Sequence, residues 1–401
     1  MLVDMKVLFL IHTLGGGGAE KVLVNLANNL DKSKYDVTVM TVINTGINRE
    51  NIAPHIKYKT ILNIPFKKKN HSKSTELKSG SLLSGGGFIK KILASGYSFL
   101  WKIIPTRILY KIFIREKYDF EVAFLEGISA KIISSSNNKD SKKIGWIHVD
   151  LLNERKSEKF FLNANQEKRC YKNFNQIVCV SNNVSEAFIE KFNFAKSKVL
   201  VKYNPLDVAD IIGKAQDDVE IDKPKKFLMG TIGRLIHQKG YDRLLRIAKR
   251  LADEKYDFEL WIIGDGLERD KLEKYIVNTQ LEDYVKLLGF RDNPYKYLKL
   301  ADLFVCSSYA EGFSTVASEA VILGVPIVTV DCSGMKELLG YNNEYGIVTE
   351  NSEEALHEGL TVILNDEKKY LHYKEKVLKR SSFFNISETV KEIESLLHLQ
   401  L

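Results

Sequence analysis

Two glutamates in one short segment are the strongest chemical signal in the sequence. Glu311 and Glu319 are separated by seven residues in the run SSYAEGFSTVASEA, directly after an apolar stretch of strand length. Gly312 permits a tight turn and the close approach of a ligand, and Ser314 or Thr315 can cap a helix that starts there. The free N–H groups of such a helix bind phosphate. Glu319, inside the helix, could then grip a ribose diol, and Glu311 the hydroxyls of a second sugar.

A second candidate site combines two cations in the run GRLIHQKG at residues 233–240. Arg234 and Lys239 lie between a predicted strand and a predicted helix, the position at which open α/β sheets bind ligands. Two fixed cations beside a helix N-terminus match a diphosphate leaving group, because they stabilise the negative charge that develops on it. The segment therefore predicts a diphosphate-binding site.

Two weaker signals lie in the first half of the chain. A glycine run that includes Gly17 and Gly18 follows the first predicted strand, but Glu20 occupies a position where the dinucleotide fingerprint requires Gly or Ala. This argues against a nicotinamide dehydrogenase. His148 ends another predicted strand, where a cleft would open. A lone histidine is more often a structural residue, yet this position favours a functional one.

Several catalytic patterns are missing from the sequence. It contains no Asp-x-Asp pair, no cluster of metal ligands at the usual spacing, no G-x-S-x-G turn and no G-x-x-x-x-G-K-[ST] loop. Metal-dependent and acyl-transfer chemistry therefore lose support, and we expect neither a metal nor a cofactor. The four cysteines lie in or beside apolar segments without CxxC spacing, which indicates reduced thiols.

The elements that must position these residues follow from an alternation of apolar runs and helical patterns. This alternation predicts parallel sheets with crossover helices. The strands fall into two sets, which indicates an α/β chain with two Rossmann-like domains. They are expected at 7–12, 37–42, 122–125, 144–148, 177–181 and 198–203 in the first set and at 227–233, 260–264, 285–289, 303–307 and 327–330 in the second.

The chain is expected to divide into three parts. Polarity rises and two prolines occur between residues 204 and 225, so we place the first domain at 1–205 and the second at 206–382. Residues 383–401 contain an amphipathic stretch whose packing partner periodicity alone does not identify. The first apolar run is interpreted as a buried strand rather than a signal peptide, and no run reaches the roughly 18 apolar residues of a membrane span.

The positive charge of the chain is concentrated in residues 66–117. This segment has twelve Lys or Arg residues against two acidic ones, a balance of +10 in a chain whose net charge is +8. Large apolar residues alternate with its cations, a pattern typical of an interfacial helix on an anionic membrane. A crossover helix packed on the sheet, with a solvated basic face, explains the same pattern. The residues expected at the membrane are Lys90, Lys91, Trp101, Lys102 and Arg107.

Nucleic acid is not expected as a partner. The sequence has no recognisable RNA- or DNA-binding motif, and outside residues 66–117 the chain has no basic excess.

These segments together resemble the GT-B fold glycosyltransferases of the retaining family 4 type. The resemblance extends through nearly all 401 residues and rests on the runs GGAEKVLVNLA, WIH, NPLD, GRLIHQKG, WIIGDG, LLGFRDN and SSYAEGFSTVASEAVILGVPIV. The last run is highly specific, whereas GGAE and GDG are weak alone. The resemblance implies an acceptor-binding domain and a nucleotide-sugar-binding domain that face each other across a cleft. It also implies that the C-terminal helix crosses back to the N-terminal domain.

The resemblance assigns a donor site to the second domain. Glu319 would bind the ribose, and the base would lie near Phe290 and Arg291. The donor diphosphate would be bound by Arg234, Lys239, Gly312, Phe313, Ser314 and Thr315.

It assigns the reacting centre to residues from both domains. His148 would contact the transferred sugar near the reacting carbon, and Glu311 would hold that sugar. Gly17 and Gly18 would let the acceptor or a phosphate approach. Because the family offers no settled nucleophile, we assign Glu311 to positioning and electrostatics rather than to covalent catalysis.

The implied activity is the transfer of a hexose from a nucleotide-sugar, which we expect to be a UDP-sugar, with retained anomeric configuration and without a metal. The acceptor would be a lipid-linked saccharide or glycan in capsule, O-antigen or other surface-polysaccharide synthesis, at the cytoplasmic face of the cell membrane. The alternative is a non-catalytic subunit that binds the sugar nucleotide and supports a partner transferase.

Overall fold

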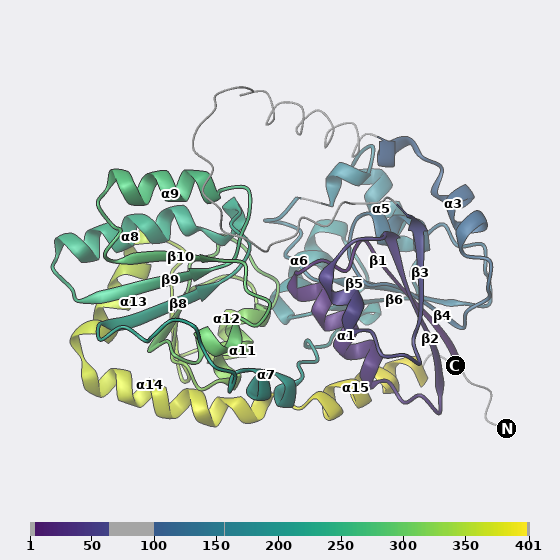
Figure 1. The fold of residues 1–401 in the computed structure, drawn as a ribbon. Coiled ribbons are helices and arrows are strands. Elements are labelled where there is room, and N and C mark those ends of the chain that lie inside the picture. Colours follow the sequence, from purple (N-terminus) through teal and green to yellow (C-terminus); the bar gives the residue numbers. More distant parts are fainter. Residues whose placement is uncertain (1–4, 64–99, 156, 399–401) are drawn as a thin grey trace.

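The computed structural model describes residues 5–63, 100–155 and 157–398. Lys90 and Lys91 lie outside the described residues. Within these ranges the strands form two parallel sheets, which lie side by side, one in each half of the chain (Figure 1).

The first sheet has the strand order β3-β2-β1-β4-β5-β6-β7. The interior strand β1 is fully buried from Val7 to Ile11, because helices cover both faces of the sheet. The strands are β1 (Met5–Ile11), β2 (Tyr35–Ile43), β3 (Lys57–Leu62), β4 (Phe120–Ala123), β5 (Lys142–Ile147), β6 (Gln176–Cys179) and β7 (Val199–Val201). The helices are α1 (Gly18–Asn29), α3 (Thr106–Phe113), α4 (Ile128–Ile133), α5 (Ala164–Lys172) and α6 (Asn182–Phe192).

The second sheet has the order β10-β9-β8-β11-β12-β13. Its strands are β8 (Phe227–Ile232), β9 (Phe258–Ile263), β10 (Val285–Gly289), β11 (Leu303–Cys306), β12 (Ile327–Val330) and β13 (Ile347–Thr349). The helices of this half are α7 (Val208–Lys214), α8 (Tyr241–Asp253), α9 (Arg269–Asn278), α10 (Tyr295–Leu298), α11 (Thr315–Ile322), α12 (Met335–Leu339), α13 (Glu353–Asn365) and α14 (Glu367–Arg380).

The expected α/β architecture with two Rossmann-like domains is confirmed. Every strand expected from the sequence is present within a few residues of its expected bounds, and all pair in parallel. β3 and β13 were not expected. β3 buries only Ile61, and β13 has three residues, so neither gives a clear apolar run. All four cysteines are free and buried.

The last helix, α15 (Ile386–His398), returns from the second half to the first and packs beside α1 (Figure 1). Its carboxylate Glu394 accepts a hydrogen bond from the backbone N–H of Asp31 at 2.8 Å, and Glu392 pairs with Lys202 at 2.8 Å. Its apolar face is buried through Val390, Ile393, Leu396 and Leu397.

One residue of the basic segment is placed differently from the expectation. Trp101 is 1% exposed, so the prediction that its ring faces a membrane is wrong. Its indole joins the core of the first half, where an apolar ring gains more from burial than at the surface. The buried ammonium group of Lys131 fixes the backbone there by donating to the carbonyl oxygens of Trp101 at 2.7 Å and Lys102 at 2.9 Å.

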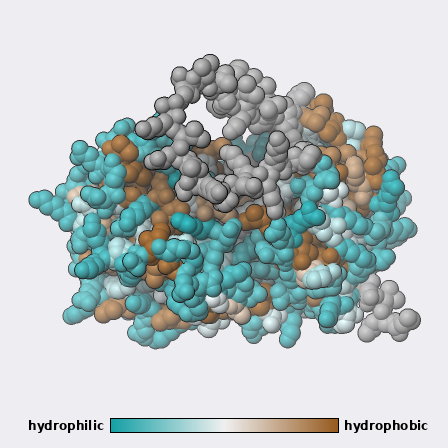
Figure 2. Space-filling view, viewed as in Figure 1, coloured by the Kyte–Doolittle hydropathy of each residue, from teal (hydrophilic) through white to brown (hydrophobic). Residues whose placement is uncertain are grey.

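The surface around α3 is apolar and basic. Leu100, Ile103, Ile108 and Ile112 are each about half exposed, and Arg107 is exposed between them. Figure 2 shows brown apolar surface at the upper right of this face, where α3 lies in Figure 1. None of the helices in the described ranges is both long enough and apolar enough to cross a bilayer.

Candidate active site

The candidate site lies where the carboxyl ends of the two sheets meet, and two glycines mark the contact. A Cβ atom added to Gly312 would collide with the carbonyl oxygen of His148, and one added to Gly18 would lie 2.5 Å from Oγ1 of Thr315. Only glycine fits at both positions, because the two domains approach so closely there. The geometry therefore brings His148 and the Gly312 turn to one place.

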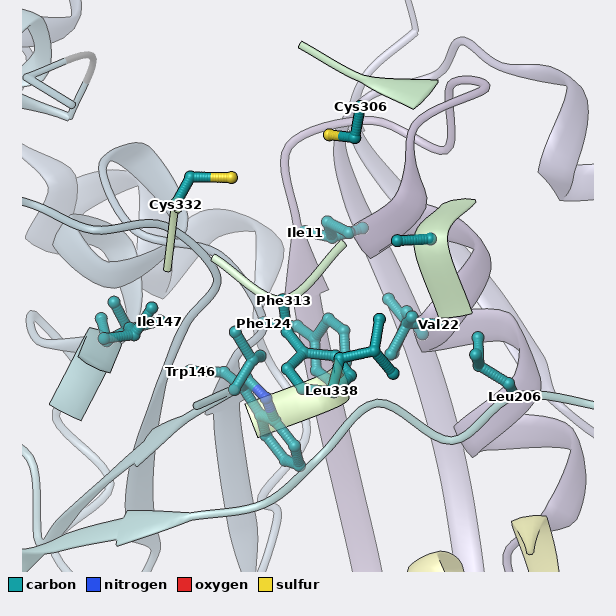
Figure 3. Packing of buried hydrophobic residues seen from close by; sticks show 14 of the residues in the cluster. Ile11, Val22, Phe124, Trp146, Ile147, Leu206, Cys306, Phe313, Cys332 and Leu338 are labelled. Atoms are coloured by element: carbon teal, nitrogen blue, oxygen red, sulfur yellow. The ribbon is translucent and has the colours of Figure 1, made fainter. Parts of the chain in front are cut away.

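Buried apolar side chains support this contact from both halves. Figure 3 shows Ile11 and Trp146 of the first half and Phe313 and Leu338 of the second in one cluster of buried residues. The amide group of Asn204 donates to the carbonyl oxygen of Phe313 at 3.3 Å. The turn that precedes α11 is thus held by the first domain as well as by its own.

α11 begins at the turn that the sequence predicted. Ser314 is its N-cap, and its side-chain oxygen accepts a hydrogen bond from the backbone N–H of Ala317 at 3.3 Å. Other N–H groups of a first helical turn have no partner inside the helix and can bind an anion. Thr315 opens the helix, and Glu319 lies buried in its second turn.

Glu311 and Lys239 form an ion pair in the second domain. Nζ of Lys239 lies 2.6 Å from Oε1 of Glu311, and the hydroxyl of Ser308 donates to the same oxygen at 2.6 Å. Burial disfavours the charge of Lys239, yet the Glu311 carboxylate holds the pKa of this lysine above its usual value. Arg243 fixes the preceding loop by donating to the carbonyl oxygen of Ser307 at 2.7 Å. The pair is therefore charged and held in place.

Arg234 is an exposed cation on the same edge of the second sheet. It faces Glu20 of the first domain, a partner that sequence reasoning missed. Burial raises the pKa of Glu20, while its own backbone N–H and the charge of Arg234 oppose that rise. Because the Glu20 carboxylate also fills the space above Gly17, the glycine loop and Glu20 belong to the same part of the domain interface.

Glu319 has two neighbours that the sequence did not reveal. Its Oε1 accepts from the hydroxyl of Tyr295 at 2.8 Å and lies 3.1 Å from Nζ of Lys21, a residue of the first domain. The Lys21 ammonium group also lies 4.4 Å from the centre of the Tyr295 ring. These contacts join positions far apart in the sequence, so no local pattern could have indicated them.

His148 is neutral and partly unsatisfied. Burial lowers its pKa to about 3, although a hydrogen bond to the backbone of Phe124 favours the charged ring. Among the described residues Nε2 of His148 has no hydrogen-bond partner, and the residue is 9% exposed. Its backbone N–H donates at 3.1 Å to Glu126, whose pKa burial raises to about 7. Glu126 is a further titratable group of the site that the sequence did not single out.

Phe290, one of the residues expected near the base, lies opposite the glycine loop of the first domain. Phe290 is 47% exposed, and its ring would lie 3.7 Å from a Cβ atom added to Gly16. The guanidinium group of Arg291 stacks 5.2 Å from the centre of the Tyr297 ring. An exposed aromatic ring opposite a glycine loop leaves a flat apolar surface, which suits a nucleobase.

Two family models match the chain with this geometry. The model described as Glycosyltransferase Family 4 matches residues 16–210, and the model described as Glycosyl transferases group 1 matches residues 214–380. The structural neighbours include Anabaena HepE in complex with UDP and glucose, with a TM-score of 0.72 and 20% identity over 98% of this chain and 100% of that chain. TarM of S. aureus has a TM-score of 0.69 and 15% identity over 98% and 99%.

Sequence relatives include an enzyme of Campylobacter jejuni, the N-acetylgalactosamine-N,N'-diacetylbacillosaminyl-diphospho-undecaprenol 4-alpha-N-acetylgalactosaminyltransferase. It is 35% identical over 202 residues, which span 50% of this chain and 53% of that protein, about half of its length. A glycosyltransferase of Haemophilus influenzae is 23% identical over 98% of this chain and 99% of its own.

Two Rossmann-like domains, with these structural neighbours, define a GT-B fold. The two family matches together span almost the whole chain, which therefore belongs to the group 1 glycosyltransferases.

Proposed function

We propose that this protein is a retaining, metal-independent hexosyltransferase that moves a sugar from a UDP-sugar to a lipid-linked saccharide during surface-polysaccharide synthesis. The donor binds to the second domain and the acceptor to the first. The reaction takes place at the cytoplasmic face of the cell membrane.

The observation that carries the proposal is the arrangement of charges around α11. The Lys239–Glu311 pair lies on one side of the turn that starts this helix, and Glu319 lies inside the helix. A diphosphate at the helix N-terminus would meet Lys239 and Arg234, and its ribose could reach Glu319. HepE and TarM were crystallised with UDP, which supports a UDP-sugar for this chain.

Glu319 already has partners at the position where the ribose of such a donor would bind. Its Oε1 already accepts from Tyr295 and pairs with Lys21, so a ribose diol would use Oε2 or displace Lys21. Phe290 would then lie beside the base.

The proposed reaction needs no protein nucleophile. The acceptor hydroxyl attacks the anomeric carbon on the face from which the diphosphate leaves, and the leaving phosphate oxygen takes the hydroxyl proton. Arg234, Lys239 and the N–H groups of α11 stabilise the charge that develops on the diphosphate, the task that a divalent metal performs elsewhere. Nε2 of His148, which has no hydrogen-bond partner among the residues that the structure describes, could exchange a hydrogen bond with a hydroxyl of the transferred sugar.

The acceptor and its membrane are supported by two observations. The name of the Campylobacter relative specifies a diphospho-undecaprenol acceptor, which is a lipid-linked saccharide. In this chain the apolar and basic surface around α3 could contact the bilayer that holds such a lipid.

The test is nucleoside-diphosphate release from a panel of UDP- and GDP-sugars in the presence of EDTA, with membrane-extracted lipid acceptors. We expect release from one donor that the lipid fraction stimulates and that Glu311→Ala abolishes. Dependence on added metal would contradict metal independence, and product of inverted configuration by NMR would contradict retention. Tight nucleotide binding with no release from any donor would favour the alternative of a non-catalytic partner subunit.

A further inference from the structure

A buried carboxylate of the second domain caps a helix of the first. Glu337, on α12, is 8% exposed, and its Oε2 accepts from the backbone N–H of Asn182 at 3.0 Å and from the Asn182 side-chain amide at 2.8 Å. Its Oε1 accepts from the backbone N–H of Asn183 at 3.2 Å. The hydroxyl of Tyr203 also donates to Oε2, at 3.0 Å. All these partners belong to the first domain, although Glu337 belongs to the second.

This contact is electrostatically favourable. Asn182 and Asn183 open α6, whose N-terminus carries a partial positive charge. A carboxylate that accepts backbone N–H bonds at such a terminus makes charge-assisted hydrogen bonds, about twice as strong as neutral ones. In Figure 1, α6 and α12 lie at the boundary between the two halves.

α6 does not need Glu337 in order to form. Its own N-cap, Ser181, already accepts from the backbone N–H of Val184 at 3.2 Å. Asn182 and Asn183 are exposed, so water can replace Glu337 if the domains separate. The contact therefore acts on the arrangement of the domains rather than on the folding of either one.

The N-terminus of α6 also holds the turn at Gly312 that precedes α11. The hydroxyl of Ser181 donates to the carbonyl oxygen of Gly312 at 3.0 Å, and Asn183 accepts from the backbone N–H of Gly334 at 3.3 Å. Gly312 in turn packs against the carbonyl of His148. A shift of α12 away from α6 would thus move the Gly312 turn, where the diphosphate is proposed to bind, away from His148.

We propose that Glu337 is a positioning residue for sugar transfer: its hold on the N-terminus of α6 keeps the two domains in the closed arrangement that sets the donor against His148. This inference rests on the function proposed above. Glu337 contacts neither the donor nor the acceptor, and its effect passes through the domain interface.

The test compares Glu337→Gln, which places an amide N–H₂ against N–H donors, with Glu337→Asp, which keeps the charge. The matched control is Glu344→Gln, because Glu344 accepts a backbone N–H bond from Asn342 inside the second domain. Three quantities are measured for each variant: kcat and KM for sugar transfer, Kd for UDP and for GDP by calorimetry, and the radius of gyration by solution X-ray scattering.

We expect Glu337→Gln to lower kcat about tenfold or more. The charge-assisted hydrogen bonds of Glu337 exist only in the closed arrangement of the domains, so their loss destabilises only that arrangement. Its nucleotide Kd should stay within about twofold of wild type, because Arg234, Lys239 and Glu319 are untouched, and its radius of gyration should increase. Glu337→Asp should lose less activity, and Glu344→Gln should match wild type.

The proposal is overturned if Glu337→Gln keeps wild-type kcat and radius of gyration, or if nucleotide affinity falls in parallel with kcat, which would indicate a structural role in the second domain. Should Glu337→Gln fail to fold, Tyr203→Phe and Asn182→Ala each remove one of the side-chain hydrogen bonds to Glu337 from the other side, and they must show the same pattern on a smaller scale. Scattering and nucleotide binding do not require transfer, so they test the contact even if no donor in the panel reacts.

Discussion

The two domains hold the functional groups of the candidate site differently. In the second domain, Lys239, Glu311 and Glu319 already have partners at 2.6 to 3.1 Å, one of which, Lys21, belongs to the first domain. In the first domain, His148 is neutral, and among the described residues its Nε2 lacks a partner. One side therefore presents fixed charges, and the other presents a neutral polar atom that a ligand must satisfy.

This difference suits the two tasks of a sugar transfer. The diphosphate gains negative charge as it leaves, so fixed cations and helix N–H groups stabilise the transition state. The hydroxyl groups of a sugar remain uncharged, and an unsatisfied neutral nitrogen selects for a hydroxyl at that position because an apolar group would leave it unpaired. Variants in each domain can test whether the second domain acts through fixed charges and the first through a neutral hydrogen-bonding atom.

The largest effect is expected in the second domain, from Lys239→Ala. It removes a cation from the diphosphate site and leaves Glu311 buried without its partner, so kcat should fall about 10³-fold and nucleotide affinity should fall as well. Initial rates of nucleoside-diphosphate release measure this. The matched control is Lys286→Ala, which removes a lysine of the edge strand β10 that lies 2.8 Å from the buried Glu259 of the neighbouring strand β9. Equal losses in both variants would contradict a specific role for Lys239.

A smaller loss with a different signature is expected in the first domain, from His148→Ala. We expect kcat to fall about 10²-fold, because one oriented hydrogen bond to the sugar is lost. The Kd for UDP should not change, since the proposed nucleotide site lies on the second domain. Calorimetry measures the Kd for UDP, and steady-state kinetics measures kcat. Weaker UDP binding in this variant would erase the distinction between the two sides.

The neutrality of His148 should appear in the pH dependence of stability. Between its ordinary pKa of 6.5 and its folded pKa of about 3, the unfolded chain binds a proton that the folded chain excludes, so stability falls as the pH falls through this window. The loss is about 2 kcal/mol at pH 5. The free energy of unfolding, measured in urea near neutral pH and near pH 5, should show this loss in wild type and not in His148→Gln.

The control for this measurement is His55→Gln, because His55 is exposed. It should keep the pH dependence of wild type. If all three proteins lose the same stability on acidification, His148 does not enter the folded state as the neutral ring.

The smallest effect is expected at the surface around α3. Arg107→Gln should weaken binding to anionic vesicles about fivefold, the contribution of one surface cation. Sedimentation with vesicles that contain anionic lipid measures this. Lys271→Gln changes an exposed lysine on α9 and should have no effect. No binding of wild type, or equal binding by Arg107→Gln, would remove the membrane from the proposed function.

Much of the architecture could be predicted because buried parallel strands read as continuous apolar runs. β9, for example, is buried at all six positions. β3 was not predicted from the sequence because it is an edge strand whose apolar and polar residues alternate weakly. Trp101 was misplaced for a related reason: a basic amphipathic pattern does not reveal which apolar side chains face the sheet.

The candidate site divides in the same way. Glu311, Glu319, Arg234 and Lys239 could be proposed from the sequence because strand ends and helix starts carry local sequence signals. The contact of Lys21 with Glu319 could not be found, because it joins residues 298 positions apart, and only the closure of the two domains brings them together.

α15 bears on how the protein is made. Its buried side chains complete the core of the first domain, yet the ribosome synthesises this helix only after the whole second sheet. Until α15 is made, the part of the first domain that it covers beside α1 stays exposed, and exposed apolar surface of this kind is prone to aggregate. The first domain therefore completes its core only after the second domain has been made. A proteolytic cut between α14 and α15 would remove from the first domain the apolar side chains that α15 contributes to that core.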